Sequence, residues 1–83
     1  MTESLFFHSK DECSLCDERY PAVKTLAERF GLSVEKVDIE ADPRLFEKYR
    51  YRIPVVVFRG FELGWGRFTV EEIEKRLRED LKD

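Results

Sequence analysis

Residues 5–16 read LFFHSKDECSLC, an apolar run that gives way to polar residues and then to two cysteines. The apolar residues Leu5–Phe7 are typical of a buried strand, and the polar residues after them are typical of a loop. From Ser14 onward, apolar side chains recur at spacings of three and four up to Phe30, and Gly31 then supplies a helix stop. The sequence therefore predicts a strand, a loop that carries a cysteine, and an amphipathic helix of about four turns.

The rest of the chain repeats these two patterns. Residues 33–39 alternate apolar and polar side chains, and Ile53–Phe58 is β-branched and apolar on both faces, as expected for strands. Asp42 is a good helix N-cap with Pro43 at the first helical position, and Thr69-Val70-Glu71-Glu72 is a capping box before a third helix. We therefore predict strands at residues 5–7, 33–39, 53–58 and 61–65, and helices at residues 14–30, 43–49 and 70–81.

These elements follow the order β-α-β-α-β-β-α, which predicts an α/β fold with a mixed four-stranded sheet flanked by helices on both faces. Because helices separate the first three strands, we expect these strands to be parallel and joined by right-handed crossovers. The turn Arg59–Gly60 makes the last two strands an antiparallel hairpin. Without a linker or repeat, residues 1–83 are expected to form one domain. We also expect the Phe residues to be largely buried and Trp65 to pack within the sheet.

Composition narrows the range of functions. The longest uncharged apolar run is Ile53–Phe58, far short of the roughly 20 residues that a membrane-spanning helix needs. The beginning of the chain has no basic region followed by a long apolar stretch, so we expect no secretory signal and a cytoplasmic location. The formal net charge of −3 argues against binding to nucleic acid. We expect the protein to be a monomer.

Both cysteines lie in Cys13-Ser14-Leu15-Cys16, where the first strand gives way to the first helix. In a chain without secretory features, this spacing beside a β-α-β pattern indicates dithiol redox chemistry rather than a structural disulfide. With a helix that begins near Ser14, the Cys13 sulfur faces unpaired backbone N–H groups and the positive end of the helix dipole, which stabilise a thiolate. We therefore predict Cys13 as the nucleophile and Cys16, one turn deeper, as the resolving thiol.

Other uses of these residues stay open. A Cys-x-x-Cys pair is also half of a zinc site, but His8 is the only other soft ligand, so a zinc or iron–sulfur site needs ligands from a second chain or from glutathione. An inert buried pair is a further alternative. A third is a partner-docking domain without redox turnover, because residues 44–67 hold six basic and two acidic side chains.

Two single residues also have competing interpretations. For His8, we favour a hydrogen bond to the backbone at the end of a strand over a role as a catalytic base, since thiolate formation here does not require one. Arg67 either holds an anion at the start of the third helix or is merely solvated.

Three local features resemble the thioredoxin superfamily, and most closely the glutaredoxins and the short bacterial glutaredoxin-like proteins with a C-x-L-C centre. Residues 9–16, SKDECSLC, are similar to the glutaredoxin run S-K-x-x-C-x-x-C. Ile53-Pro54 resembles the cis-proline dipeptide that opens the third strand, and Gly64-Trp65-Gly66 lies where glutaredoxins carry a glycine pair. The resemblance extends over nearly the whole chain and implies a thioredoxin-like fold.

The resemblance also implies a thiol-disulfide oxidoreductase that reduces protein or small-molecule disulfides through a mixed disulfide. It implies a cis bond at Pro54 beside the dithiol, and the backbone of Ile53 would then pair with a peptide or glutathione. Substrate-binding positions that follow from it are Lys10, Ile53, Gly64 and Gly66. We add Arg67 as a substrate-binding candidate because of its place at the start of the third helix. No tightly bound cofactor is expected, and glutathione stays open as a co-substrate. The electron donor is either glutathione or a reductase, since residues 63–68 also resemble the tail of the redoxins that reduce ribonucleotide reductase.

Overall fold

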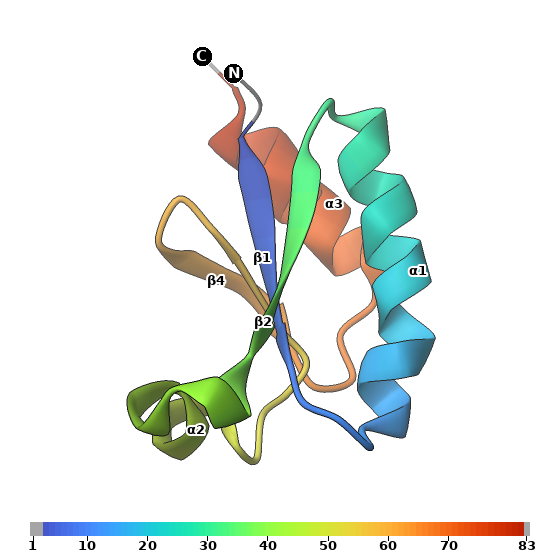
Figure 1. The fold of residues 1–83 in the computed structure, drawn as a ribbon. Helices are drawn as coiled ribbons and strands as arrows, with labels where there is room; N and C mark the ends of the chain where they lie inside the picture. Colours follow the sequence, from blue (N-terminus) through green and yellow to red (C-terminus); the bar gives the residue numbers. More distant parts are fainter. Residues whose placement is uncertain (1–2, 83) are drawn as a thin grey trace.

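The computed structural model describes residues 3–82, so residues 1, 2 and 83 of the predicted domain lie outside the described part. Strands and helices follow one another in the predicted order, with one short 3-10 helix added (Figure 1). The elements are β1 (Ser4–Ser9), α1 (Ser14–Arg29), β2 (Ser33–Asp38), the 3-10 helix η1 (Ile39–Ala41), α2 (Pro43–Tyr49), β3 (Val55–Phe58), β4 (Phe61–Trp65) and α3 (Val70–Asp80).

The four strands form one mixed sheet in the order β2-β1-β3-β4. β1 and β2 are parallel, as predicted, and β3 and β4 form the predicted antiparallel hairpin. β3, however, runs antiparallel to β1, with Phe7 opposite Val56 and His8 opposite Val55. The prediction that the first three strands are all parallel is therefore wrong for β3.

The length of α2 explains the direction of β3. A parallel crossover must bring the chain back along a strand, and the six residues of β2 span about 20 Å. The seven residues of α2 make a helix of only about 10 Å. Figure 1 shows α2 beside the end of the sheet where β2 finishes, so the chain enters β3 from that same end.

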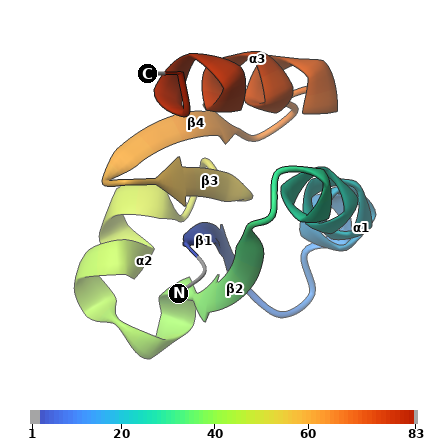
Figure 2. The same cartoon turned by 90° about the horizontal axis from the view of Figure 1, so that it is seen from above.

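The sheet separates two groups of buried side chains, as predicted for helices on both faces. The larger group joins α1 and α3 to the sheet through Val23 and Leu26 of α1, Ile73 and Leu77 of α3, and Phe7, Val56 and Phe58 of the strands. The smaller group lies on the α2 side of the sheet and consists of Ile39, Tyr49 of α2 and Val55 of β3. Figure 2 shows α1 and α2 on opposite sides of the sheet.

The helices α2 and α3 begin at the capping residues that the sequence predicts. The Asp42 carboxylate accepts a hydrogen bond from the backbone N–H of Arg44, at 2.9 Å, and Pro43 opens α2. Thr69 and Glu72 form both hydrogen bonds of a capping box at the start of α3. These contacts satisfy backbone N–H groups that a helix start otherwise leaves without partners.

A β-bulge interrupts the pairing of β3 with β4, so that Leu63 is left between two paired residues. Leu63 is buried in the core beside α3. Trp65 lies opposite Val55, on the side of α2, and is 53% exposed. The prediction of a packed Trp65 is wrong, because the bulge ends the simple alternation on which it was based.

Two of the phenylalanines are also more exposed than predicted. Phe6 faces the side of the sheet that α2 covers only at one end, and Phe61 lies next to the hairpin turn; both are exposed. Phe7, Phe58 and Phe68 are buried as expected. Within residues 3–82, no helix is both long and apolar enough to cross a membrane.

Candidate functional site

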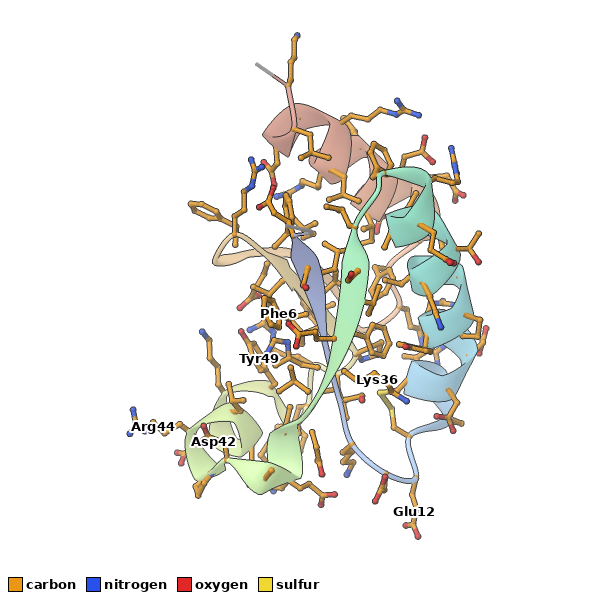
Figure 3. The ribbon with its side chains drawn as sticks, turned by 45° about the horizontal axis from the view of Figure 1, so that its top comes forward. Phe6, Glu12, Lys36, Asp42, Arg44 and Tyr49 are labelled. Atoms are coloured by element: carbon orange, nitrogen blue, oxygen red, sulfur yellow. A yellow bond between two sulfur atoms is a disulfide. The ribbon has the colours of Figure 1, made fainter. Side chains whose placement is uncertain are left out.

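The loop between β1 and α1 holds Cys13 at the first residue outside the helix. Cys13 has an extended backbone and acts as the N-cap of α1, which begins at Ser14. Glu12, just before it, has a φ of 60°, in the left-handed region that side chains with a Cβ rarely adopt. Figure 3 shows the Glu12 side chain pointing outward from this loop. As the N-cap, Cys13 turns its side chain toward the first turn of α1, where it accepts a hydrogen bond from the backbone N–H of Cys16.

The two cysteines are joined as a disulfide, with their Cα atoms 5.2 Å apart. The Cys13 Sγ accepts a hydrogen bond from the backbone N–H of Cys16, at 3.2 Å. Cys13 is half-buried, whereas Cys16 is only 2% exposed and belongs to the core. The sulfur of Cys13 is therefore the one that a molecule from solvent reaches first.

A hydrogen-bond donor and nearby carboxylates have opposite effects on a negative charge at the Cys13 sulfur. The backbone N–H of Cys16, in the first turn of α1, donates to its sulfur, and such a donor at a helix start favours a thiolate. Asp11 and Glu12 in the loop and Asp17 in the first turn are exposed acidic side chains that oppose negative charge. The donor contacts the sulfur directly, whereas these exposed carboxylates act through water, which screens them.

Ile53 and Pro54 lie at the same end of the sheet as the dithiol. Their peptide bond is cis, as the resemblance implied. The pairing of β1 with β3 ends with His8 opposite Val55, so Lys10 follows β1 at the same end of the sheet where Pro54 leads into β3. Pro54 is buried and Ile53 half-buried. Figure 1 shows that the β1–α1 loop and the segment leading into β3 share one end of the molecule.

The segment after β4 is attached to this proline loop through Gly66. The backbone N–H of Gly66 donates to the carbonyl oxygens of Arg52, at 2.9 Å, and Pro54, at 2.8 Å. Gly66 has a φ of 63°, which glycine adopts without steric cost. Arg67 follows it and is exposed. The structure thus brings Lys10, Ile53, Gly66 and Arg67 to the end of the sheet that carries Cys13.

Gly64 differs from these residues, because packing accounts for it. A Cβ placed on Gly64 would lie 2.6 Å from Cδ1 of Ile73 and 3.2 Å from Cβ of Phe68. Both neighbours are buried. The missing side chain lets α3 lie directly against β4.

Arg52 is a residue near the site that our sequence analysis did not select. Its guanidinium pairs with Glu62 and lies 4.9 Å from the Trp65 ring centroid and 5.8 Å from that of Tyr49. Its carbonyl also holds Gly66. The alternation of tyrosine and arginine at residues 49–52, directly before Ile53-Pro54, is the sequence signal that could have identified it, since arginine stacks on aromatic rings.

His8 is a buried structural residue, in agreement with the interpretation we favoured. Its Nδ1 lies 3.3 Å from the carbonyl oxygen of Val55, and its ring packs against Tyr49 with centroids 5.0 Å apart. Burial lowers the pKa of His8 below its usual value, and the nearby charge of Lys48 lowers it further, against hydrogen bonds to backbone carbonyls that raise it. Among residues 3–82, no group of three or more His, Cys, Asp or Glu side chains is arranged to hold a metal ion.

The lowered pKa of His8 predicts how stability depends on pH. Unfolded chains bind a proton on His8 near pH 6.5, whereas the folded protein does so only at a lower pH. The stability that neutral His8 contributes is therefore complete above pH 6.5 and is lost as the pH falls through the folded pKa. Urea unfolding of the wild type and of His8→Gln at several pH values should show a steeper loss for the wild type just below pH 6.5. Parallel curves over this range would contradict the prediction.

A cysteine pair at the first strand-to-helix junction, at the same end of the sheet as a cis-proline, places this fold in the thioredoxin class. The model of the "Glutaredoxin-like domain (DUF836)" family matches residues 4–81. The chain belongs to this glutaredoxin-like family, and its cysteine pair fits a redox role.

Solved structures agree with this assignment. A target protein from X. campestris, XcR50, is 32% identical, with 90% of this chain and 96% of that chain covered and a TM-score of 0.73. Protein Ne2328 from Nitrosomonas europaea is 20% identical, with 92% of both chains covered and a TM-score of 0.77. Thioredoxin 1 from Thermosipho africanus is 23% identical, with 95% of this chain and 99% of that chain covered and a TM-score of 0.63. The last two likenesses concern the fold alone.

Proposed function

We propose that this protein is a thiol-disulfide oxidoreductase in which Cys13 is the nucleophile and Cys16 the resolving thiol. The observation that carries the proposal is the difference between the two sulfurs. Cys13 is half-buried at the N-cap of α1 and accepts a backbone N–H, whereas Cys16 is buried one turn into the helix. A reachable sulfur stabilised as a thiolate and a shielded one within bonding distance of it are what two-step disulfide reduction requires.

The reaction begins with both cysteines reduced. The Cys13 thiolate attacks one sulfur of the substrate disulfide; a Cys13–substrate bond forms, the substrate S–S bond breaks, and the departing thiolate takes a proton from water. The Cys16 thiol then loses its proton and attacks the Cys13 sulfur, so the second substrate thiolate leaves. Two electrons pass from the protein to the substrate. The product is the Cys13–Cys16 disulfide, the state of the pair in the structure.

Binding and recycling complete the proposal. The carbonyl oxygen of Ile53, beside Pro54, would hold an extended substrate or glutathione, because the Ile53 N–H already donates to the carbonyl oxygen of Tyr49, at 3.1 Å. Lys10, Gly66 and Arg67 would lie around this substrate, and Gly64 supports the region through packing. The substrate is a disulfide-containing protein or a small disulfide. A second dithiol or two molecules of glutathione must return the electrons, so a reductase or glutathione is the donor. We propose that the protein works as a cytoplasmic monomer in maintaining thiol redox balance.

A variant that lacks the resolving thiol tests this sequence of steps. Cys16→Ser should complete the first attack but not the second, so it should accumulate a mixed disulfide when mixed with an oxidised substrate. Mass spectrometry without reductant should find one substrate molecule attached to Cys13. The matched control is Cys13→Ser, which keeps a single cysteine at the buried position. Equal trapping by the two variants, or none by Cys16→Ser, would contradict the assignment of roles.

A further inference from the structure

Arg52 contacts both the end of α2 and β4, and it comes directly before the Ile53-Pro54 dipeptide in the chain. Its guanidinium pairs with the carboxylate of Glu62 in β4 and lies 4.9 Å from the ring centroid of Trp65 in the same strand. The same guanidinium lies 5.8 Å from the ring centroid of Tyr49, the last residue of α2. Figure 3 shows Tyr49 between α2 and the strands. One side chain therefore links two elements next to the proposed substrate site.

The main chain around Arg52 is also held by hydrogen bonds, with one exception. The Arg52 N–H, at 2.8 Å, and the Ile53 N–H, at 3.1 Å, both donate to the carbonyl oxygen of Tyr49. The N–H of Gly66 donates to the carbonyl oxygens of Arg52, at 2.9 Å, and Pro54, at 2.8 Å. The exception is the carbonyl oxygen of Ile53, to which no donor within residues 3–82 bonds. Of the main-chain groups of residues 52–54, this oxygen is the one left for a bound molecule.

The segment before β3 depends on such contacts, because residues 50–54 form no strand or helix. The ion pair between Arg52 and Glu62 is suited to hold it, since the two side chains are only 32% and 29% exposed. Ion pairs between fully exposed side chains contribute little, because water screens them and two long side chains lose entropy. Contact with two aromatic rings restricts the guanidinium further. These contacts therefore restrict both the Arg52 side chain and the segment attached to it.

We infer that Arg52 is a positioning residue for substrate binding, an inference that rests on the proposed function. Its ion pair with Glu62 and its aromatic contacts hold residues 52–54, so that the free carbonyl oxygen of Ile53 is presented to a main-chain N–H of a peptide beside Cys13. Arg52 itself touches no substrate, because its guanidinium is already engaged by α2 and β4. The loss of Arg52 should therefore weaken the binding of a peptide substrate and leave the chemistry of the dithiol unchanged.

Steady-state kinetics on a peptide disulfide test this role. The substrate consists of two capped pentapeptides, Ala-Ala-Cys-Ala-Ala, joined through their cysteines, and a dithiol is the donor. It carries no charge, so removing a charge from the protein does not change its electrostatic attraction. Arg52→Met keeps an unbranched side chain without the guanidinium, and it should raise KM by about tenfold with kcat within about twofold of the wild type. A fall in kcat as large as the rise in KM would contradict a positioning role.

Variants of Glu62 show whether Arg52 acts through its ion pair. Glu62→Gln keeps the shape of the side chain and should also raise KM severalfold, and it decides the test alone should Arg52→Met fail to fold. The double variant should have a KM within about twofold of that of Arg52→Met, because both changes break the same contact. If only Arg52→Met raises KM, the guanidinium contacts the peptide itself and the inference is wrong.

A matched control removes an arginine elsewhere. Arg78→Met breaks an ion pair with Glu74 that lies within α3. It should leave KM for the peptide disulfide within about twofold of the wild type, since a surface ion pair of this kind contributes little. An equal rise in KM for Arg78→Met and Arg52→Met would show a general effect of lost charge and would overturn the inference.

NMR relaxation tests the same contacts in the oxidised protein, without turnover. The amide order parameters of Arg52, Ile53 and Gly66 should be near about 0.85, the value of rigid backbone, in the wild type. In Arg52→Met and in Glu62→Gln they should fall toward about 0.6, the range of flexible backbone. The amides of β1, in the middle of the sheet, should keep their values. Unchanged order at these three residues, or an equal loss throughout β1, would refute a local role of Arg52.

The two measurements separate this inference from the proposed function. If the wild type never reduces the peptide disulfide, the proposed function is refuted, and the order parameters still decide whether Arg52 holds residues 52–54. If the wild type reduces the peptide and Arg52→Met has an unchanged KM, the positioning role alone is refuted.

Discussion

Replacing Cys13 with serine is expected to abolish disulfide reduction, with kcat/KM falling by more than about a thousandfold. A serine hydroxyl is not ionised near neutral pH, even where a backbone N–H points at it, and it does not attack sulfur. The N-cap itself survives, since serine is a preferred N-cap residue. The loss should therefore appear without unfolding, and the measurement is turnover of a small disulfide with a dithiol donor alongside circular dichroism.

A neighbouring substitution controls for disturbance of the loop. Ser14→Ala changes the adjacent exposed residue at the first position of α1 and leaves both sulfurs in place. It should retain activity within about threefold of the wild type, because nothing in the proposed steps uses the Ser14 hydroxyl. Turnover by Cys13→Ser comparable with that of Ser14→Ala would refute the assignment of Cys13 as nucleophile.

Adding a single methyl group at Gly64 is expected to destabilise the fold by about 1–3 kcal/mol, the usual cost of overpacking a core. The new Cβ would lie 2.6 Å from Ile73 Cδ1, and because Ile73 is fully buried, its side chain must shift against its packed neighbours. Urea unfolding of Gly64→Ala should measure the loss. Gly64→Val should be worse, since it adds two further methyl groups beside Ile73 and Phe68, which a Cβ alone already crowds.

Deleting the atom that clashes tests this explanation. Ile73→Val removes Cδ1 and by itself should cost about 0.5–1.5 kcal/mol. If the contact is the cause, Gly64→Ala should cost less in the Ile73→Val background than in the wild type. Gly60→Ala is a useful contrast, because Gly60 has open space around its Cβ position but a φ of 83°. Its cost should not respond to Ile73→Val, and full additivity for Gly64 would contradict the explanation.

Much of the fold followed from local chemistry in the sequence. The caps at Asp42 and Thr69 and the hairpin turn at Arg59–Gly60 depend on neighbouring residues only, so their sequence signals were sufficient. The direction of β3 depends on the end of the sheet at which the short α2 finishes. The pattern of apolar residues within a strand does not reveal whether that strand is parallel or antiparallel to its neighbour. The exposure of Trp65 depends on a bulge formed by pairing two strands, which alternation along one strand cannot show.

In the candidate site, too, features that depend on neighbouring residues were predictable from the sequence, and features that depend on contacts between distant segments were not. The Cys13–Cys16 spacing at a strand-to-helix junction predicted which sulfur is nearer to solvent, because helix geometry alone determines it. The cis bond before Pro54 came from resemblance, since most X-Pro bonds are trans. The stack of Arg52 on Trp65 was not predicted, because it arises where separate segments meet.

The most direct test of the account is to find which sulfur reacts first in the reduced protein. Iodoacetamide is added about two pH units below the ordinary cysteine pKa of about 8.5, and the modified residue is located by mass spectrometry. The account predicts rapid alkylation at Cys13 and little at Cys16, because the first is reachable and stabilised as a thiolate by the start of α1. Preferential alkylation of Cys16, or reaction at Cys13 no faster than at a free cysteine, would contradict it.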